Sequence, residues 1–320
     1  KVGDRSQDPA WSPDNTRLVY RCGSTNVCVR DWQGNGRSEL LVDVSTNGKD
    51  AVSRFDWSPD GKYILLSWSA SGGKWGIGRI DVAAKTATDF IPYGNPGMVF
   101  DARYSPAGHS VVFSRESDGL STGDLRIADS EGQNERSLNT GVTGAHATDW
   151  SADGRIYFYS SYAPASNEVY SILADGTDLL RLTDNDFADQ YPDSWAPRPR
   201  ESRIAIQSDR DGNNDIYEID LYGSVIRQIT DSPGEDGSPA YSPDGTRIAF
   251  YSDRDGSDRE IFVMNYDLTG LIQLTFNDVD DVWPTWCGDP LEVETTSWQL
   301  PELFPFCACP EDSIFSWSVG

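Results

Sequence analysis

The chain has 320 residues, a formal net charge of −25, and 38% hydrophobic and 12% aromatic residues. This length exceeds the usual size of one hydrophobic core, so we expect either two domains or one repeat architecture. Phosphate groups and anionic lipids would be repelled by so acidic a surface, which argues against nucleic acid and membrane partners. No apolar run is long enough to span a membrane, and Lys1 to Asp4 show no signal peptide, so we expect none or one already removed.

An aromatic residue recurs along the chain at steps of 45 to 47 residues. In its clear copies it is followed by Ser-Pro-Asp-Gly, and then by a short apolar run such as Tyr63–Leu66. Short β-branched and aromatic runs between Gly, Asp and Pro predict strands joined by turns, and no long 3.6-residue period predicts a helix. The seven anchors are Trp11, Trp57, Tyr104, Trp150, Trp195, Tyr241 and Trp286.

Each repeat continues with a second apolar run and closes on a pair such as Leu182-Thr183, which gives about four strands. A single four-stranded sheet cannot bury both of its faces, whereas radially arranged sheets bury them against each other. We therefore predict an all-β propeller of four-stranded blades over residues 1–290. Seven anchors favour seven blades, with six as the alternative. Residues 291–320 are a divergent C-terminal segment that completes blade 7 or contacts a neighbouring subunit.

Two of the five cysteines lie close together in the first repeat. Aligned on the fifth repeat, Cys22 and Cys28 fall on the two sides of one hairpin, so we predict a disulfide between them. Disulfides imply an oxidising compartment, and no paired Cys-x2-Cys motif predicts zinc. The pairing of the other three, Cys287, Cys307 and Cys309, stays open.

Two acid-rich turns are candidate calcium sites. Hard oxygen ligands on a tight glycine turn suit Ca²⁺, but aspartates in such hairpins also cap their own backbone amides. Both interpretations stay open. The candidate metal ligands are Asp209, Asp211 and Asp215 in one turn and Asp253, Asp255 and Asp258 in the other.

The loops between repeats are acidic as well, and in a propeller they emerge on the same face as these turns. That face would attract a cationic partner protein, unless the acids are simply solvated. Its loop residues are Asp184, Asp186 and Asp189; Asp231, Glu235 and Asp236; and Asp278, Asp280 and Asp281.

The sequence does not indicate an enzyme. No G-x-S-x-G motif stands on a strand-to-helix turn, because the Gly119–Gly123 match lies where strands and no helix are predicted. The only histidines are His109, expected in an exposed turn, and His146, expected in a loop near the channel mouth.

The segments Ser208–Tyr217 and Ser252–Gly256, together with Trp-Ser-Pro-Asp-Gly, resemble the repeats of the TolB-like (PD40) propeller family, and the resemblance covers residues 8 to about 290. Bacterial TolB is a periplasmic protein that binds partner proteins. The same repeats form the propellers of prolyl-oligopeptidase-type peptidases and modules of large secreted or surface proteins. Because a fold does not select a function, the resemblance leaves these roles open.

We therefore expect a non-enzymatic propeller that is extracellular, on the cell surface or periplasmic. It would bind a protein or associate with itself, through the acidic loop face or residues 291–320, as part of an extracellular assembly or filament. The alternatives are the propeller of a larger peptidase and a propeller that binds a glycan or another small ligand.

Overall fold

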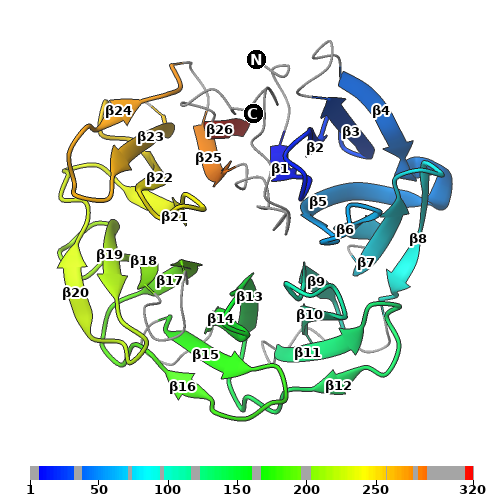
Figure 1. Cartoon of the computed structure of the whole chain (residues 1–320), viewed down its shortest axis with the longest axis horizontal. Coiled ribbons are helices and arrows are strands. Elements are labelled where there is room, and N and C mark those ends of the chain that lie inside the picture. The colour runs from blue at the N-terminus through cyan, green and yellow to red at the C-terminus, as the bar shows by residue number, and fades with distance from the viewer. Residues whose placement is uncertain are drawn as a thin grey trace, which may run out of the picture.

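The computed structural model describes residues 7–31, 38–70, 74–93, 97–116, 123–160, 167–195, 203–256, 258–276, 280–286 and 314–319. These residues form six four-stranded antiparallel sheets and one two-stranded sheet. The sheets stand radially around a central channel, and the first strand of each lies next to that channel (Figure 1). We call this first strand the inner strand.

The strands of blades 1 to 3 follow the chain in order. Blade 1 comprises β1 (Gln7–Trp11), β2 (Arg17–Arg21), β3 (Asn26–Asp31) and β4 (Ser38–Asp43). Blade 2 comprises β5 (Lys49–Trp57), β6 (Tyr63–Ala70), β7 (Lys74–Asp81) and β8 (Thr86–Ile91). Blade 3 comprises β9 (Val99–Tyr104), β10 (Ser110–Arg115), β11 (Asp124–Asp129) and β12 (Arg136–Ser137).

Blades 4 to 6 repeat the same order. Blade 4 comprises β13 (Ala145–Trp150), β14 (Arg155–Ser160), β15 (Val169–Leu173) and β16 (Leu180–Arg181). Blade 5 comprises β17 (Asp189–Trp195), β18 (Arg203–Ser208), β19 (Asp215–Ile219) and β20 (Val225–Gln228). Blade 6 comprises β21 (Asp236–Tyr241), β22 (Arg247–Ser252), β23 (Glu260–Asn265) and β24 (Ile272–Gln273).

The core lies between the blades and is centred on their second strands. Each second strand carries an apolar run that is at most 2% exposed, because neighbouring sheets cover both of its faces. These runs are Leu18–Tyr20, Ile64–Leu66, Val111–Phe113, Ile156–Phe158, Ile204–Ile206 and Ile248–Phe250. The only helix among the described residues is the 3₁₀ turn η1 (Val44–Asn47), so this part of the chain has no helix that is long and apolar enough to span a membrane.

The prediction of seven four-stranded blades is wrong, and the alternative of six agrees with the described residues. The seventh anchor lies on β25 (Asp280–Trp286), which pairs within these residues only with β26 (Ile314–Val319). The reason is visible in the sequence, because no Ser-Pro-Asp-Gly turn and apolar run follow Trp286. The divergent segment instead supplies β26, which lies antiparallel to β25 in the same chain, while residues 287–313 are outside the described part.

The first and the last inner strands, β1 and β25, meet beside the channel. Among the described strands, no sheet combines β1 to β4 with β25 or β26. The inner strand β1 lies beside β25 and β26 (Figure 1). We call this junction the seam.

Candidate functional site

Hydrogen bonds join neighbouring inner strands and fix the shape of the channel. The Asp56 carboxylate accepts from the amide of Tyr104 at 2.7 Å, and Asp193 accepts from the amide of Tyr241 at 2.8 Å. The carboxylate of Asp149 accepts from the amide of Ser194 at 3.2 Å. Each of these carboxylates therefore links its own blade to the next one.

At two other junctions the anchor indole makes this link. The Trp57 Nε1–H donates to the carbonyl of Ala10 at 3.0 Å, and the Trp286 Nε1–H donates to the carbonyl of Ala240 at 2.9 Å. The anchors were recognisable in the sequence as packing residues, but this second role depends on the geometry of the inner strands.

Removal from water raises the pKa of the linking carboxyls. The pKa of Asp56 rises to about 6, although the nearby guanidinium of Arg103 acts in the opposite direction. Burial likewise raises the pKa of Asp149, and it raises that of Asp193 well above its usual range, with the charge of Asp149 adding to the effect. The channel wall thus holds carboxyl groups whose ionisation is disfavoured.

A pocket of about 580 Å³ lies in the channel, and all seven inner strands contribute to it. Because turn residues such as Pro13 and Pro59 also line it, the pocket lies toward the end that carries the Ser-Pro-Asp-Gly turns. The expected docking face, with the acid-rich turns, is at the opposite end. We call this cavity the channel pocket; its inner-strand residues include Trp11, Arg54, Asp56, Arg103, Tyr191, Asp193, Ser238, Trp283 and Trp286.

Bulges in the inner strands turn side chains toward the channel pocket. Arg54, Tyr191, Ser238 and Trp283 have left-handed backbone conformations with φ between 48° and 52°, each at a break in the register with the second strand. Non-glycine residues rarely adopt this conformation, and such strain is typical of functional sites. The Trp283 side chain is 46% exposed, so its indole is available to a ligand.

Prolines cover part of the same wall. Four inner strands carry a proline beside the channel, which removes a backbone N–H donor and is tolerated because the inner strand is a sheet edge. These prolines were the one sequence signal that could have located the channel pocket. They are Pro9, Pro192, Pro239 and Pro284.

A charged cluster stands beside the channel pocket, built on Asp101. This fully buried carboxylate forms an ion pair with Arg54 and a hydrogen bond with His146, whose Nδ1 lies 3.0 Å from Asp101 Oδ2. Although burial opposes it, these two neighbours lower the pKa of Asp101. The His146 ring stacks on Tyr159 with a 5.1 Å centroid distance. His146 therefore lies within β13 and not in the predicted loop, whereas His109 is exposed between β9 and β10 as expected.

The first aspartate of each acid-rich turn binds the neighbouring between-blade loop. Asp209 accepts from the amide of Ala188 and Asp253 from the amide of Glu235, each at 2.7 Å. These bonds go to another loop and not to the turn's own amides, so the capping interpretation stays a prediction.

The other acids of these turns have side-chain donors. Asp215 accepts from the Thr230 hydroxyl at 3.0 Å, Asp255 accepts from Gln273 at 3.0 Å, and Asp211 accepts from the Tyr217 hydroxyl. Within the described part of the chain, no three or more acidic, histidine or cysteine side chains, Asp258 included, are grouped to hold a metal. The structure therefore does not gather the six aspartates into the calcium sites that we considered, and calcium binding remains a prediction.

The acidic loop face is less charged than the sequence suggested. Asp189, Asp236 and Asp281 are at most 2% exposed, since they begin inner strands and point inward. Arg210 and Arg254 pair with Asp189 and Asp236 at 3.0 and 2.9 Å. The hydrogen bond between Asp209 and the Ala188 amide places an acid-rich turn and a between-blade loop on the same face. Part of the negative charge that we expected on this face is buried. Asp278 is outside the described residues.

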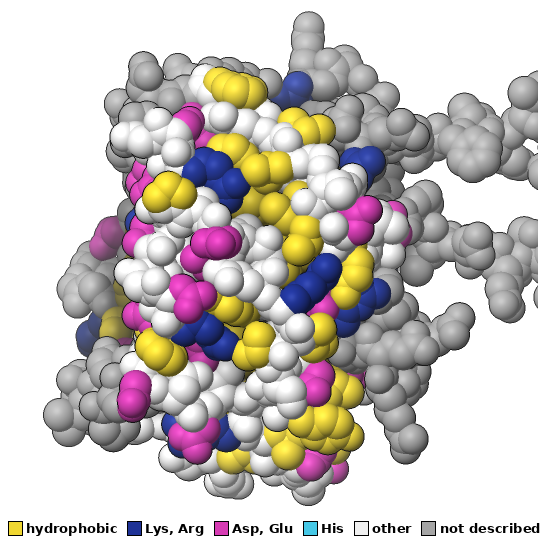
Figure 2. Space-filling model, turned by 90° about the vertical axis from the view of Figure 1, so that its left-hand side faces the viewer, with side chains coloured by type: hydrophobic (Ala, Val, Ile, Leu, Met, Phe, Trp, Pro, Cys, Tyr) yellow, Lys and Arg dark blue, Asp and Glu magenta, His cyan; other side chains and the backbone are white. Residues whose placement is uncertain are grey.

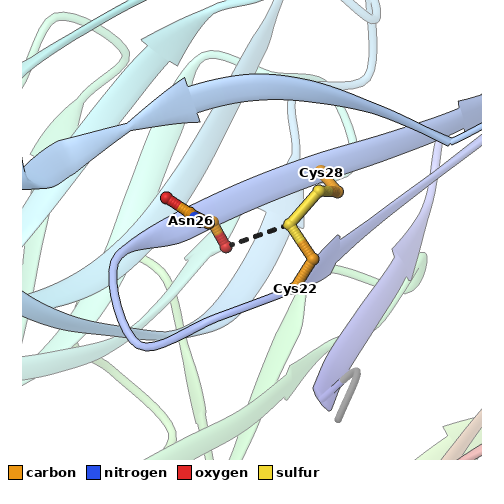
Figure 3. Close-up of a disulfide and its surroundings, with 3 residues drawn as sticks. All are labelled: Cys22, Asn26 and Cys28. Atoms are coloured by element: carbon orange, nitrogen blue, oxygen red, sulfur yellow. Dashed lines mark hydrogen bonds between the residues drawn. A yellow bond between two sulfur atoms is a disulfide. The ribbon is translucent and has the colours of Figure 1, made fainter. Parts of the chain in front are cut away.

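Blade 1 has a disulfide in the hairpin between β2 and β3. Cys22 and Cys28 are bonded with their Cα atoms 5.8 Å apart, and the Asn26 carbonyl lies 3.6 Å from the Cys22 sulfur (Figure 3). This is the pairing that the alignment of the repeats predicted. Cys287, Cys307 and Cys309 lie outside the described residues.

Comparison with known proteins places these features in a family. An uncharacterized protein of Agrobacterium fabrum is 28% identical over 71% of this chain and 73% of its own length. The Tol-Pal system protein TolB of Bordetella pertussis is 29% identical over 75% of this chain and 54% of the relative, so the chain spans about half of that TolB.

The fold also matches solved propellers. The β-propeller domain of the Trilobed protease from Pyrococcus furiosus, described as having an open velcro topology, superposes with a TM-score of 0.62 and 16% identity over 85% of this chain and 84% of that domain. The family model of the TolB beta propeller domain matches residues 124–297, which is more than half of the chain. The chain is therefore a member of the TolB β-propeller family.

Proposed function

We propose that this chain is a non-enzymatic interaction module whose channel pocket binds a segment of a partner protein. The observation that carries the proposal is the wall of the channel pocket, where exposed Trp283 stands among prolines and aromatic anchors. Concave sites with aromatic anchors and a few polar groups are typical of hot spots in protein recognition. The relationship to a Tol-Pal system protein supports a role in a protein assembly.

Polar groups in the same wall would select the segment. The guanidinium groups of Arg54 and Arg103 could meet a carboxylate of the partner, while Asp56 and Asp193 could meet a cationic or hydroxyl group. The disulfide of blade 1 supports an oxidising location outside the cytoplasm, such as the periplasm or the cell exterior.

Peptide selection tests this proposal. A displayed peptide library is enriched on the wild-type protein, and the selected peptides are measured against Trp283→Asn, since asparagine tolerates the left-handed backbone at this position. We expect at least a tenfold loss of affinity, with Leu40→Ala on the exposed outer strand of blade 1 as the control. Peptides that bind both variants equally well would refute the pocket as the binding site.

A second candidate function is the propeller domain of a larger peptidase. It is favoured by the described strands, none of which joins blade 1 to β25 or β26 in one sheet, since a protease propeller of the same fold is described by an open velcro topology. Sequencing the gene beyond the codon for Gly320 decides it, because a hydrolase domain with a G-x-S-x-G motif would have to follow.

A further inference from the structure

The outer hairpins of blades 5 and 6 expose a group of apolar side chains. Six of the twelve large hydrophobic residues that are exposed in the described part of the chain lie here, with exposed fractions from 41% to 81%. Figure 2 views the molecule from this side and shows hydrophobic side chains gathered on it. We call this surface the apolar rim; it consists of Tyr222, Val225 and Ile226 on blade 5 and Leu268, Leu271 and Ile272 on blade 6.

Direct contacts hold the two outer hairpins that carry the apolar rim together. Tyr266, at the start of the turn that carries Leu268, lies under the guanidinium of Arg227 from β20, 3.9 Å from the ring centroid. The Tyr266 hydroxyl also donates to Glu218 of blade 5 at 2.9 Å. Because these contacts fix one outer hairpin against the other, the apolar rim is a preformed surface and not two separate turns.

The turns of the apolar rim carry acidic groups, and two cations pack between them on Tyr266. Asp220 accepts hydrogen bonds from the amides of Tyr222 and Ser224 in its own turn, at 2.8 and 2.9 Å. Asp267 accepts from Thr269, which lowers the pKa of Asp267 and keeps it ionised at neutral pH. Arg203 and Arg227 lie over the Tyr266 ring, and Arg227 faces the buried carboxylate of Glu218 at 3.4 Å. A ligand therefore meets apolar side chains with a carboxylate at each turn.

We infer that the apolar rim is a second interaction surface, which binds a partner protein with aliphatic side chains bordered by Lys or Arg. A second copy of this chain is a poor partner, since each copy carries a net charge of −25 and the same acidic turns. An anionic membrane is disfavoured for the same reason. Six partly exposed side chains offer on the order of 500 Å² per side, near the lower limit of specific interfaces, so the complex is a transient one. This inference does not depend on the channel pocket.

Designed helical peptides can probe this surface. The first peptide alternates Leu and Lys faces, the second replaces every Lys with Glu, and the third replaces every Leu with Ser. Fluorescence anisotropy measures their binding to the wild type, to the rim variant Ile226→Ser/Leu271→Ser/Ile272→Ser, and to Leu40→Ser. Leu40 is a matched control, since it lies on the outer strand of blade 1 and is 53% exposed, as is Ile272.

We expect the Leu/Lys peptide to bind the wild type and Leu40→Ser alike, and the rim variant at least tenfold more weakly. High salt should weaken the binding, since exposed charges are screened. Equal affinity for the rim variant, or equal affinity of the Leu/Glu peptide, would overturn the inference. It would also be overturned by a wild-type dimer that the rim variant loses, or by rim-dependent binding to phosphatidylcholine vesicles. Channel pocket variants such as Trp283→Asn should leave this binding unchanged, so the two proposals can fail separately.

Discussion

Blades 5 and 1 hold the same hairpin in two chemically different ways. In blade 5 the hairpin after the second strand is fixed by Arg210, which pairs with buried Asp189, whereas in blade 1 a disulfide joins the two strands. Both hairpins present a backbone carbonyl to the next inner strand. Asn214 accepts from the amide of Asp236 at 2.7 Å, and Ser24 accepts from the amide of Val52 at 3.0 Å.

The comparison indicates that the common requirement is the position of this carbonyl. An ion pair and a covalent bond are two means of fixing it, so the Asp-Arg-Asp-Gly sequence need not recur in every blade. The same requirement explains why the acids at the start of the inner strands are internal. Their function is to position the channel wall, and not to charge the surface.

The largest expected loss of stability follows from removal of the arginine that pairs with a buried aspartate in the hairpin of blade 6. In Arg254→Ala the fully buried carboxylate of Asp236 loses its partner, which should lower the free energy of unfolding by about 3–5 kcal/mol. Urea denaturation measures it. The control is Lys62→Ala, whose ion pair with Asp60 is exposed and should contribute less than about 1 kcal/mol. Similar losses in both variants would contradict the role of the buried pair.

The buried carboxyl of Asp56, whose pKa is raised, should respond to pH. Removal from water raises the pKa of Asp56 from its usual 3.8 to about 6. Between these values the folded state keeps a proton that the unfolded state releases, so the free energy of unfolding falls as the pH rises from 4 to 6. In Asp56→Asn this loss is absent, while the amide oxygen can still accept the bond from Tyr104.

Urea denaturation at pH 4, 5, 6 and 7 compares the two proteins, and the wild type should lose at most about 3 kcal/mol more than Asp56→Asn over this range. Other carboxyls titrate in both proteins and cancel in the difference. Parallel pH profiles would show that Asp56 is not the titrating group.

Loss of the disulfide in blade 1 should lower the free energy of unfolding by a smaller amount. Cys22→Ser/Cys28→Ser opens a short loop, for which chain entropy predicts a loss of about 2 kcal/mol. Amide hydrogen exchange gives a sharper test, since the Val52 amide binds the Ser24 carbonyl in this hairpin and should exchange faster. Unchanged exchange at Val52 would separate the disulfide from the positioning of the next inner strand.

The smallest expected effect concerns calcium. The acid-rich turns of blades 5 and 6 already have protein donors for their carboxylates, so the melting temperature should be the same in EDTA and in millimolar Ca²⁺. A rise with Ca²⁺ that EDTA reverses and that Asp209→Asn abolishes would instead establish the predicted site.

Much of the fold could be predicted because it depends on local sequence repeated at a fixed period. The spacing of the anchors predicted the repeating blades, and the apolar run after each turn predicted the buried second strand. The predicted number of blades was wrong because the repeat does not continue after the seventh anchor. An anchor such as Trp286 predicts an inner strand, but it does not provide the three strands that would complete a blade.

The channel pocket could not be predicted in this way. Its shape depends on left-handed residues such as Arg54 and Trp283, which have no local preference for that conformation. Packing of the whole ring imposes it. Likewise, nothing in the sequence around Asp101 indicates that Arg54 and His146, from the two flanking blades, meet it beside the channel.

The seam gives the ring a property that a continuous sheet closure would not allow. Among the described strands no backbone ladder joins β1 to β25 or β26, so these strands can separate without breaking one. The channel pocket crosses this seam, with Trp11 on one side and Trp283 on the other. A segment bound to both side chains would hold the two sides of the seam together. Its affinity and the closed state of the ring are then thermodynamically linked, so that whatever holds the ring shut also strengthens binding.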